Sequence, residues 1–293
     1  MPGVAFVVNG SLVRGGGHFL TLCRGAAARY GWRAEFQVTE KAEAGVAAAN
    51  SAALDGIDLV VAVGGDGTVR GCAEGLARTG VPLGIVPHGT ANLLARTLRI
   101  PGNPRAALAV ALDSASVDRV IDLAVADDVP FTAMAGMGLD AAVVADTRLK
   151  HQFGWLAYAV SGAVHLSLPP ARFSISLDDG APVERDARSV VVGNSGLLPG
   201  GFSLLPDARI DDGLLDVGVL APRGPFGWPR LATRVLTRRD HQDRMLERFR
   251  ARKVEITTKA PLPREVDGEL VTAGHSLTVT VQPRALTVRM PRL

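Results

Sequence analysis

The sequence has few cysteines and no hydrophobic run long enough to cross a membrane. Its two cysteines, Cys23 and Cys72, provide neither a disulfide framework nor metal-site spacing, so a reducing cytoplasm is the expected compartment. The longest apolar stretch, Phe153–Leu168, has about 16 residues, short of the ~20 that span a bilayer, and predicts a buried helix. The N-terminus, MPGVAFVVNG, lacks the charged and apolar regions of a signal peptide and predicts a first strand.

An excess of charge of one sign is also missing, since the net charge is only +3. We therefore expect no nucleic-acid partner. The basic residues are unevenly placed, because residues 222–253 hold ten Arg and Lys against three Asp and Glu. We expect a helix around Leu231–Arg252 that carries these charges among apolar side chains. Such a helix suits an anionic membrane surface, which would make the protein peripherally membrane-associated, or simply a solvated helix surface.

Residues 1–125 alternate between strand and helix patterns. The expected strands are Val4–Val8, Ala34–Val38, Leu59–Val63 and Leu83–Pro87, and the expected helices are Phe19–Tyr30, Glu40–Leu54, Val69–Arg78, Thr90–Leu98 and Pro104–Leu112. This alternation predicts an α/β domain, a parallel sheet covered by helices on both faces. Ligands of such sheets bind beyond the carboxyl ends of the strands.

Residues 126–293 have a different pattern, which predicts a second, mostly antiparallel β domain. The expected strands are Ala171–Leu177, Ser189–Gly193, Leu215–Leu220, Val254–Thr258, Leu277–Val281 and Leu286–Met290. Turns such as Asp178-Asp179-Gly180 and Asp211-Asp212-Gly213 separate them.

The stretch VVAVGGDGTV, residues 60–69, joins a buried strand to a glycine-rich turn. Such a turn exposes backbone N–H groups that can surround phosphate oxygens. A carboxylate at Asp66 would repel phosphate unless a cation such as Mg²⁺ intervened, and Thr68 can donate a hydroxyl hydrogen bond. No Gly-Lys-Ser/Thr follows, which argues against a P-loop kinase. A plain strand-to-helix connection is the alternative.

Four ordered motifs resemble those of the diacylglycerol kinase-like lipid kinases, a family related to the sphingosine kinases. They are GGDGT at 64–68, LGIVPHGTANLLARTLRIP at 83–101, SVVVGNSGLLPGGFSLLPDARIDDGLLDVGVL at 189–220 and VDGE at 266–269. The NAD kinases share GGDGT, but the Thr-Gly-Ser-Thr segment expected of them is absent. The resemblance implies an NAD kinase/diacylglycerol kinase-like fold.

The resemblance also implies roles for individual residues. Glu269 would be the general base, Asp66 would act beside the phosphates, and Asp267 would support Mg²⁺ or orient the base. The implied ATP-binding residues are Asn9, Gly10, Ser11, Thr39, Gly64, Gly65, Asp66, Gly67, Thr68, Val69, Arg70, Gly71 and Thr90. The implied structural Mg²⁺ site comprises Arg209, Asp212 and Leu214. From the residues alone, Asp212-Gly213 and Asp267-Gly268 are equally ordinary hairpin turns.

The activity implied is transfer of the γ-phosphoryl group of ATP to a lipid hydroxyl, with diacylglycerol converted to phosphatidic acid. ATP, Mg²⁺ and a lipid at an anionic membrane surface are the expected partners, and a homodimer is possible. An NAD kinase-like small-molecule kinase and a non-catalytic nucleotide or lipid sensor are the alternatives.

Three positions depart from the family pattern. Gly10 follows Asn9 where the family has proline, Arg70-Gly71 replaces an Asn-Glu pair, and Leu93 follows Asn92 where aspartate is commoner. The first two departures motivate the sensor hypothesis.

Overall fold

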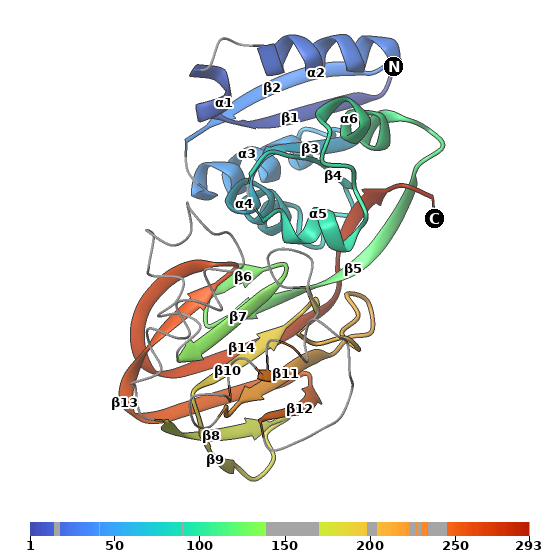
Figure 1. Cartoon of the computed structure of the whole chain (residues 1–293). Coiled ribbons are helices and arrows are strands. Elements are labelled where there is room, and N and C mark those ends of the chain that lie inside the picture. Colours follow the sequence, from blue (N-terminus) through green and yellow to red (C-terminus); the bar gives the residue numbers. More distant parts are fainter. Residues whose placement is uncertain are drawn as a thin grey trace. The chain divides into compact units, whose positions relative to one another are not determined.

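The chain divides into two compact units, as the computed structural model of the protein shows (Figure 1). The structure describes residues 1–14, 18–40, 42–89, 91–138, 170–197, 204–222, 227, 230–231, 233 and 245–292. The first unit comprises Met1–Leu123 and Pro283–Leu293, and the second comprises Ala124–Gln282. We expected the division after residue 125, with everything beyond it in one domain. The last residues group with the first unit because the expected strand Leu286–Met290 is the end of a longer strand that pairs with the parallel sheet, a pairing that the sequence did not indicate.

The first unit is built on a parallel sheet with the neighbour order β2-β1-β3-β4. Its strands are β1 (Gly3–Asn9), β2 (Arg33–Thr39), β3 (Leu59–Gly64) and β4 (Leu83–Pro87). The end of β14 (Glu269–Met290) adds to β4 in parallel, with Val288 opposite Leu83. The strand order reverses between β1 and β3, so the loops after these two strands occupy the position where doubly wound sheets bind ligands.

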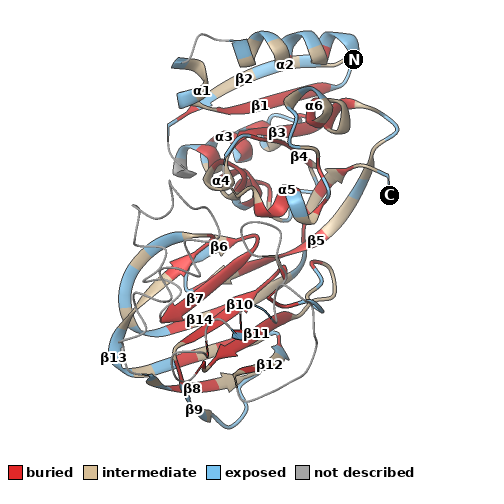
Figure 2. Cartoon of the chain, in the orientation of Figure 1, coloured by how far each residue is buried: buried red, intermediate tan, exposed pale blue. Residues whose placement is uncertain are grey.

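Six helices in the described part of the first unit accompany the sheet. They are α1 (Gly10–Arg14), α2 (His18–Arg29), α3 (Ala42–Leu54), α4 (Asp66–Leu76), α5 (Leu93–Thr97) and α6 (Pro104–Leu112). Helices α2 and α6 pack together, and α3 packs with α4. Strands β1, β3 and β4 are buried along almost their whole length (Figure 2), which explains their uninterrupted apolar sequences.

Helices α3 and α4 approach each other closely through glycines. A Cβ on Gly75 would lie 2.4 Å from the backbone oxygen of Val46, and one on Gly45 would lie 3.7 Å from Cα of Gly71. Gly71 itself is buried. The backbone of Gly71 therefore lies in van der Waals contact with α3 at Gly45.

The second unit is mostly antiparallel, as expected. Its strands are β6 (Val129–Phe131), β7 (Met134–Gly138), β8 (Ala171–Leu177), β9 (Val183–Ala187), β10 (Ser189–Gly193), β11 (Leu215–Leu220), β12 (Leu246–Ala251) and β13 (Lys253–Val266). Strands β7, β10, β11 and β12 are antiparallel neighbours, and β13 pairs with β7, β8 and β14. Strand β5 (Val117–Ala126) leads from the first unit into the second.

Two apolar clusters stabilise the second unit. The larger is formed by residues such as Phe131, Phe173 and Val254. The smaller comprises Met134, Val191, Leu204, Leu205, Leu220, Leu231 and Leu246, with Ala208 packed against it. Leu231 and Leu246 therefore lie in a core rather than on a membrane-facing surface.

The predicted helix around Leu231–Arg252 is wrong over its last part. Residues Leu246–Ala251 form strand β12, because β11 offers them an antiparallel partner with Asp216 opposite Arg250. Residues 234–244 of this prediction, and the predicted helix Phe153–Leu168, lie outside the described residues.

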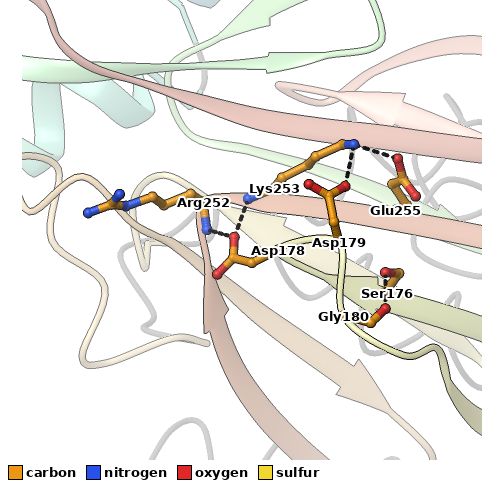
Figure 3. A network of polar contacts seen from close by, with 7 residues as sticks. All are labelled: Ser176, Asp178, Asp179, Gly180, Arg252, Lys253 and Glu255. Carbon is orange, nitrogen blue, oxygen red and sulfur yellow. Dashed lines mark hydrogen bonds and ion pairs between the residues drawn. The ribbon is translucent and has the colours of Figure 1, made fainter.

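The turn after β8 ties two parts of the second unit together (Figure 3). Asp178 and Asp179 both have positive φ, 51° and 60°. The Asp178 carboxylate accepts hydrogen bonds from the backbone N–H groups of Arg252, 2.7 Å, and Lys253, 2.9 Å. The Lys253 ammonium forms ion pairs with Asp179 and Glu255, and these neighbours raise its pKa.

Candidate functional site

The glycine loop connects β3 to α4 at the carboxyl edge of the sheet. Gly65 caps α4 in an extended conformation, and its carbonyl oxygen accepts hydrogen bonds from the N–H groups of Thr68 and Val69, both 3.1 Å. A Cβ on Gly64 would lie 2.4 Å from the Thr68 hydroxyl oxygen. A side chain at position 64 would therefore overlap the Thr68 side chain, so this position requires glycine. Asp66 and Gly67 begin the helix, whose positive dipole end favours an anion.

The first loop meets the glycine loop. The Asn9 amide nitrogen lies 3.4 Å from the Thr68 hydroxyl, and its amide oxygen accepts hydrogen bonds from the N–H, 3.0 Å, and hydroxyl, 2.7 Å, of Ser11. Asn9 also lies opposite Thr39 in the β1–β2 ladder. The structure thus brings together the ends of β1, β2 and β3, three of the expected nucleotide-binding segments.

The loop after β4 lies against the same place. The Asp66 carboxylate accepts hydrogen bonds from the N–H groups of Asn92, 2.9 Å, and Leu93, 2.8 Å. A Cβ on Gly89 would lie 3.1 Å from Cα of Gly65. Asp66 therefore joins the glycine loop to the start of α5, a role that the sequence did not indicate. Thr90 lies outside the described residues.

Asn92 occupies an unusual conformation in this loop. Its φ is 47°, in the left-handed region, and its amide nitrogen donates to the carbonyl of Gly89 at 2.8 Å. Its amide oxygen is buried without a hydrogen-bond partner. A left-handed asparagine is among the few non-glycine residues that tolerate this backbone.

Two of the departures from the family pattern lie beside neighbouring segments. A Cβ on Gly10 would lie 2.4 Å from a carboxylate oxygen of Glu40, which forms an ion pair with Arg14 at 2.7 Å. The Glu40 side chain, which is 62% exposed, would therefore have to move to admit a side chain at position 10. Arg70 is half-buried on α4, and Gly71 faces α3 as described above. The glycine at position 10, which departs from the family pattern, is the sequence feature that could have pointed to Glu40 and Arg14.

The Asp-Gly-Glu motif forms the tight turn between β13 and β14. Asp267 and Gly268 have φ values of 47° and 78°, and Val266 pairs with Glu269 across the turn. Glu269 is exposed as the first residue of β14, whereas the Asp267 side chain is buried on the backbone of residues 132–134.

A further turn, Gly193-Asn194-Ser195, contacts the same backbone, and the sequence indicated no role for it. The N–H groups of Asn194 and Ser195 donate to the carbonyl oxygen of Ala133 at 2.9 and 3.1 Å. Ser195 is fully buried, and its hydroxyl has no hydrogen-bond partner. The Gly-Asn-Ser sequence after a buried strand was the signal that could have indicated it.

The expected metal segment is crowded with charges. Asp212 accepts a hydrogen bond from the N–H of Leu214 at 3.1 Å and forms an ion pair with Arg250. Arg250 also lies 3.3 Å from one carboxylate oxygen of Asp216. Arg209 lies 3.9 Å from the Asp211 carboxylate. Within the described residues, no group of three or more His, Cys, Asp or Glu side chains converges as a metal site would.

Asp216 nevertheless makes this segment compatible with a cation. Its second carboxylate oxygen is buried without a hydrogen-bond partner. Burial raises the pKa of Asp216 to about 6, opposed by Arg250 and reinforced by Asp212. A carboxylate oxygen without a hydrogen-bond partner, together with backbone carbonyls, is the oxygen chemistry that Mg²⁺ prefers. The segment therefore offers a cation one carboxylate oxygen, that of Asp216, whereas the carboxylate of Asp212, the expected ligand, is paired with Arg250.

Neither cysteine is suited to catalysis. Burial raises the pKa of the Cys23 and Cys72 thiols to about 12, so neither supplies a thiolate at neutral pH. No helix in the described part of the chain is long and apolar enough to cross a membrane.

Comparison with known proteins agrees with this architecture. Residues 4–124 match the diacylglycerol kinase catalytic domain, and residues 133–290 match the YegS C-terminal NAD kinase beta sandwich-like domain. The protein named "Probable lipid kinase YegS-like" of Pseudomonas aeruginosa (strain UCBPP-PA14) is 37% identical over 242 residues, 80% of this chain and 78% of that protein.

Two further similarities differ in extent. An uncharacterized protein of Synechocystis sp. is 29% identical over 246 residues, 81% of this chain but only 56% of that protein's length. A solved structure from Bacillus anthracis str. Sterne has a TM-score of 0.82 at 25% identity, covering 97% of this chain and 94% of that one.

The glycine-loop α/β unit and the antiparallel β unit thus define the diacylglycerol kinase/NAD kinase-like fold, a fold of phosphotransferases. Within it, the chain belongs to the YegS/diacylglycerol kinase family.

Proposed function

We propose that this protein is an ATP-dependent lipid kinase that phosphorylates diacylglycerol to phosphatidic acid. The observation that carries the proposal is the convergence of the loops after β1, β3 and β4, through Asn9–Thr68 and Asp66–Asn92 contacts. A phosphate group is the ligand expected of such loops, because glycine-rich turns expose backbone N–H groups near the switch point of a doubly wound sheet. The names of relatives support a lipid acceptor.

In this proposal the first unit binds ATP. Gly64 to Thr68 and Thr90 surround the phosphates, with Thr68 as a hydroxyl donor, whereas Val69 and Gly71, also expected there, are buried in α4. Asn9, Gly10, Ser11 and Thr39 contact the remainder of the nucleotide. Phosphoryl transfer needs little covalent chemistry from the protein, so positioning and charge neutralisation account for most of the rate.

The second unit supplies the general base. The Glu269 carboxylate takes the proton of the lipid hydroxyl, the hydroxyl oxygen bonds to the γ-phosphorus, and the bond to the bridging oxygen of ADP breaks. The exposure of Glu269 at the start of β14 supports this role, because an acceptor can reach it. Asp66 and Asp267 have their carboxylates on backbone amides, so we assign them no proton transfer.

Mg²⁺ is proposed in two places. With ATP it neutralises phosphate charge, and at the structural site it would be held by the carbonyls of Arg209 and Leu214 and the carboxylate of Asp212. The Asp212→Asn variant should abolish any Mg²⁺-dependent rise in melting temperature. An unchanged rise would remove the structural site from the account.

Peripheral membrane association is proposed for the basic segment 222–253. Replacing Arg238 and Arg239 by Glu should weaken sedimentation with phosphatidylglycerol vesicles and leave ATP binding unchanged, because Lys and Arg side chains near an anionic surface attract it. Vesicle binding that does not change would refute this part of the proposal.

The test of the proposed function is phosphate transfer from γ-labelled ATP to micellar diacylglycerol, with NAD in a parallel reaction. Label in the organic extract supports the lipid kinase, and label on NAD supports the alternative small-molecule kinase. ATP binding without transfer to either acceptor would favour a sensor.

A further inference from the structure

We propose that Asp267 is a positioning residue that fixes the turn bearing Glu269, by binding backbone amides rather than a metal ion or a substrate proton. The inference rests on the proposed function, in which Glu269 is the general base. It assigns the aspartate of the Asp-Gly-Glu motif a role through the protein backbone.

The hydrogen bonds of the Asp267 carboxylate carry this inference. One oxygen accepts from the N–H, 2.9 Å, and the hydroxyl, 3.2 Å, of Thr132. The other accepts from the N–H groups of Ala133, 2.9 Å, and Met134, 3.1 Å. An ionised carboxylate offers about four lone-pair positions. All of them are therefore occupied, and none remains for inner-sphere coordination of Mg²⁺.

Burial makes this arrangement costly to rearrange. Asp267 is 9% exposed and Thr132 is 4% exposed. The backbone of Asp267 adds a hydrogen bond in the opposite direction, from its N–H to the carbonyl of Met134 at 2.8 Å. Turning the carboxylate toward a substrate would leave three backbone N–H groups without their acceptor, which is strongly unfavourable in a buried place.

The turn geometry explains how this arrangement fixes Glu269. Asp267 and Gly268 both have positive φ, and the N–H of Gly268 donates to the buried Glu265 carboxylate at 2.7 Å. Asp267 is thus held by its own carboxylate, which binds residues 132–134, and Gly268 is held by the carboxylate of Glu265. Glu269 follows immediately, so its backbone position depends on theirs.

The same contacts extend to a second turn. The carbonyl of Ala133 accepts from Asn194 and Ser195, so Asp267 indirectly holds the Gly-Asn-Ser turn as well. Loss of the Asp267 carboxylate should therefore loosen residues 131–136 and 193–197 together.

The chain contains a matched control. Asp178 is also an aspartate with positive φ in a hairpin turn of the second unit, and its carboxylate also accepts from backbone N–H groups, those of Arg252 and Lys253 (Figure 3). Asp178→Asn removes a comparable turn interaction from a turn that carries no proposed catalytic residue.

The experiment compares wild type, D267N, D178N and E269Q in the full chain, with γ-labelled ATP and micellar diacylglycerol. Asparagine tolerates positive φ but loses one acceptor oxygen. We expect D267N to lower kcat by about a hundredfold with KM for ATP within about twofold of wild type, since small misplacements of a catalytic group have effects of this size. D178N should keep wild-type kcat. Hydrogen–deuterium exchange of residues 131–136 should accelerate in D267N alone.

A wild-type kcat in D267N, with E269Q inactive, would overturn the inference and leave the proposed function intact. A D267N pH–rate profile that loses a limb present in wild type would also overturn it, because Asp267 would then titrate in the reaction. No lipid phosphorylation by wild type would instead refute the proposed function, and the exchange measurement would still test whether Asp267 holds the turn.

Discussion

Replacing Asp216 by asparagine should stabilise the metal-free protein at neutral pH. The rise in its pKa from 3.8 to about 6 means that ionising Asp216 costs the folded state about 3 kcal/mol more than the unfolded state, at 1.36 kcal/mol per pKa unit. The side chain is 8% exposed, so water does little to reduce this cost. Asparagine has nearly the same shape and cannot ionise.

The sign of the pH dependence follows from the direction of this shift. Because the folded-state pKa is the higher one, the folded protein binds the proton more tightly. The stabilising contribution is fully present below pH 3.8 and is lost as the pH rises through about 6. Between pH 5 and 7.5 the wild type should lose about 1.4 kcal/mol from this group, and D216N should not.

The assay is urea unfolding, followed by circular dichroism in EDTA at pH 5 and pH 7.5. We expect D216N to exceed wild type by about 3 kcal/mol at pH 7.5 and by about 1.6 kcal/mol at pH 5. The control is D186N, which removes a carboxylate that is 56% exposed and so tests whether the loss of any acidic side chain from the second unit has the same effect. The same pH dependence of stability in D216N and wild type would show that Asp216 does not have the raised pKa.

Three further predictions concern the first unit. D66N should weaken ATP binding by about tenfold, because the side chain loses one of its two hydrogen bonds to the backbone of the loop after β4. Calorimetry that shows equal affinity for ATP would contradict the role given to Asp66. G75A should lower the free energy of unfolding by about 1–3 kcal/mol, because the added methyl group would overlap α3. The control G25A has open space around it and should raise the free energy of unfolding by about 0.5–1 kcal/mol. Equal effects of the two variants in thermal unfolding would contradict the close packing of α3 and α4. Cys23 and Cys72 should react with a thiol reagent at pH 8 only upon unfolding, since burial raises the pKa of both; rapid labelling of the native protein would contradict this.

The sequence predicted the elements whose pattern is local. Leu83–Pro87, Pro104–Leu112 and Leu215–Leu220 have the predicted bounds, because each combines an apolar run with a turn or capping signal at its ends. The sequence mispredicted Leu246–Ala251, where alternating arginines among apolar residues fitted a basic helix. Pairing with β11 decides this segment, and the partner lies some 30 residues away in the chain.

The candidate site was predicted at the level of motifs but not of contacts. The sequence identified Asp66 and Asp267 as functional carboxylates, and the structure places both on backbone amides of distant loops. Such contacts depend on where the fold brings loops together, which no local pattern records. The ion pair of Glu40 with Arg14 beside Gly10 was missed for the same reason.

The measurement that tests the central claim most directly is transfer of labelled phosphate from γ-labelled ATP to diacylglycerol by wild type and E269Q, with Mg²⁺ present. We expect labelled phosphatidic acid with wild type and none with E269Q, with equal ATP binding by both proteins. Equal transfer by the two proteins would remove Glu269 as the base. No transfer to lipid by wild type that binds ATP would contradict the lipid kinase itself.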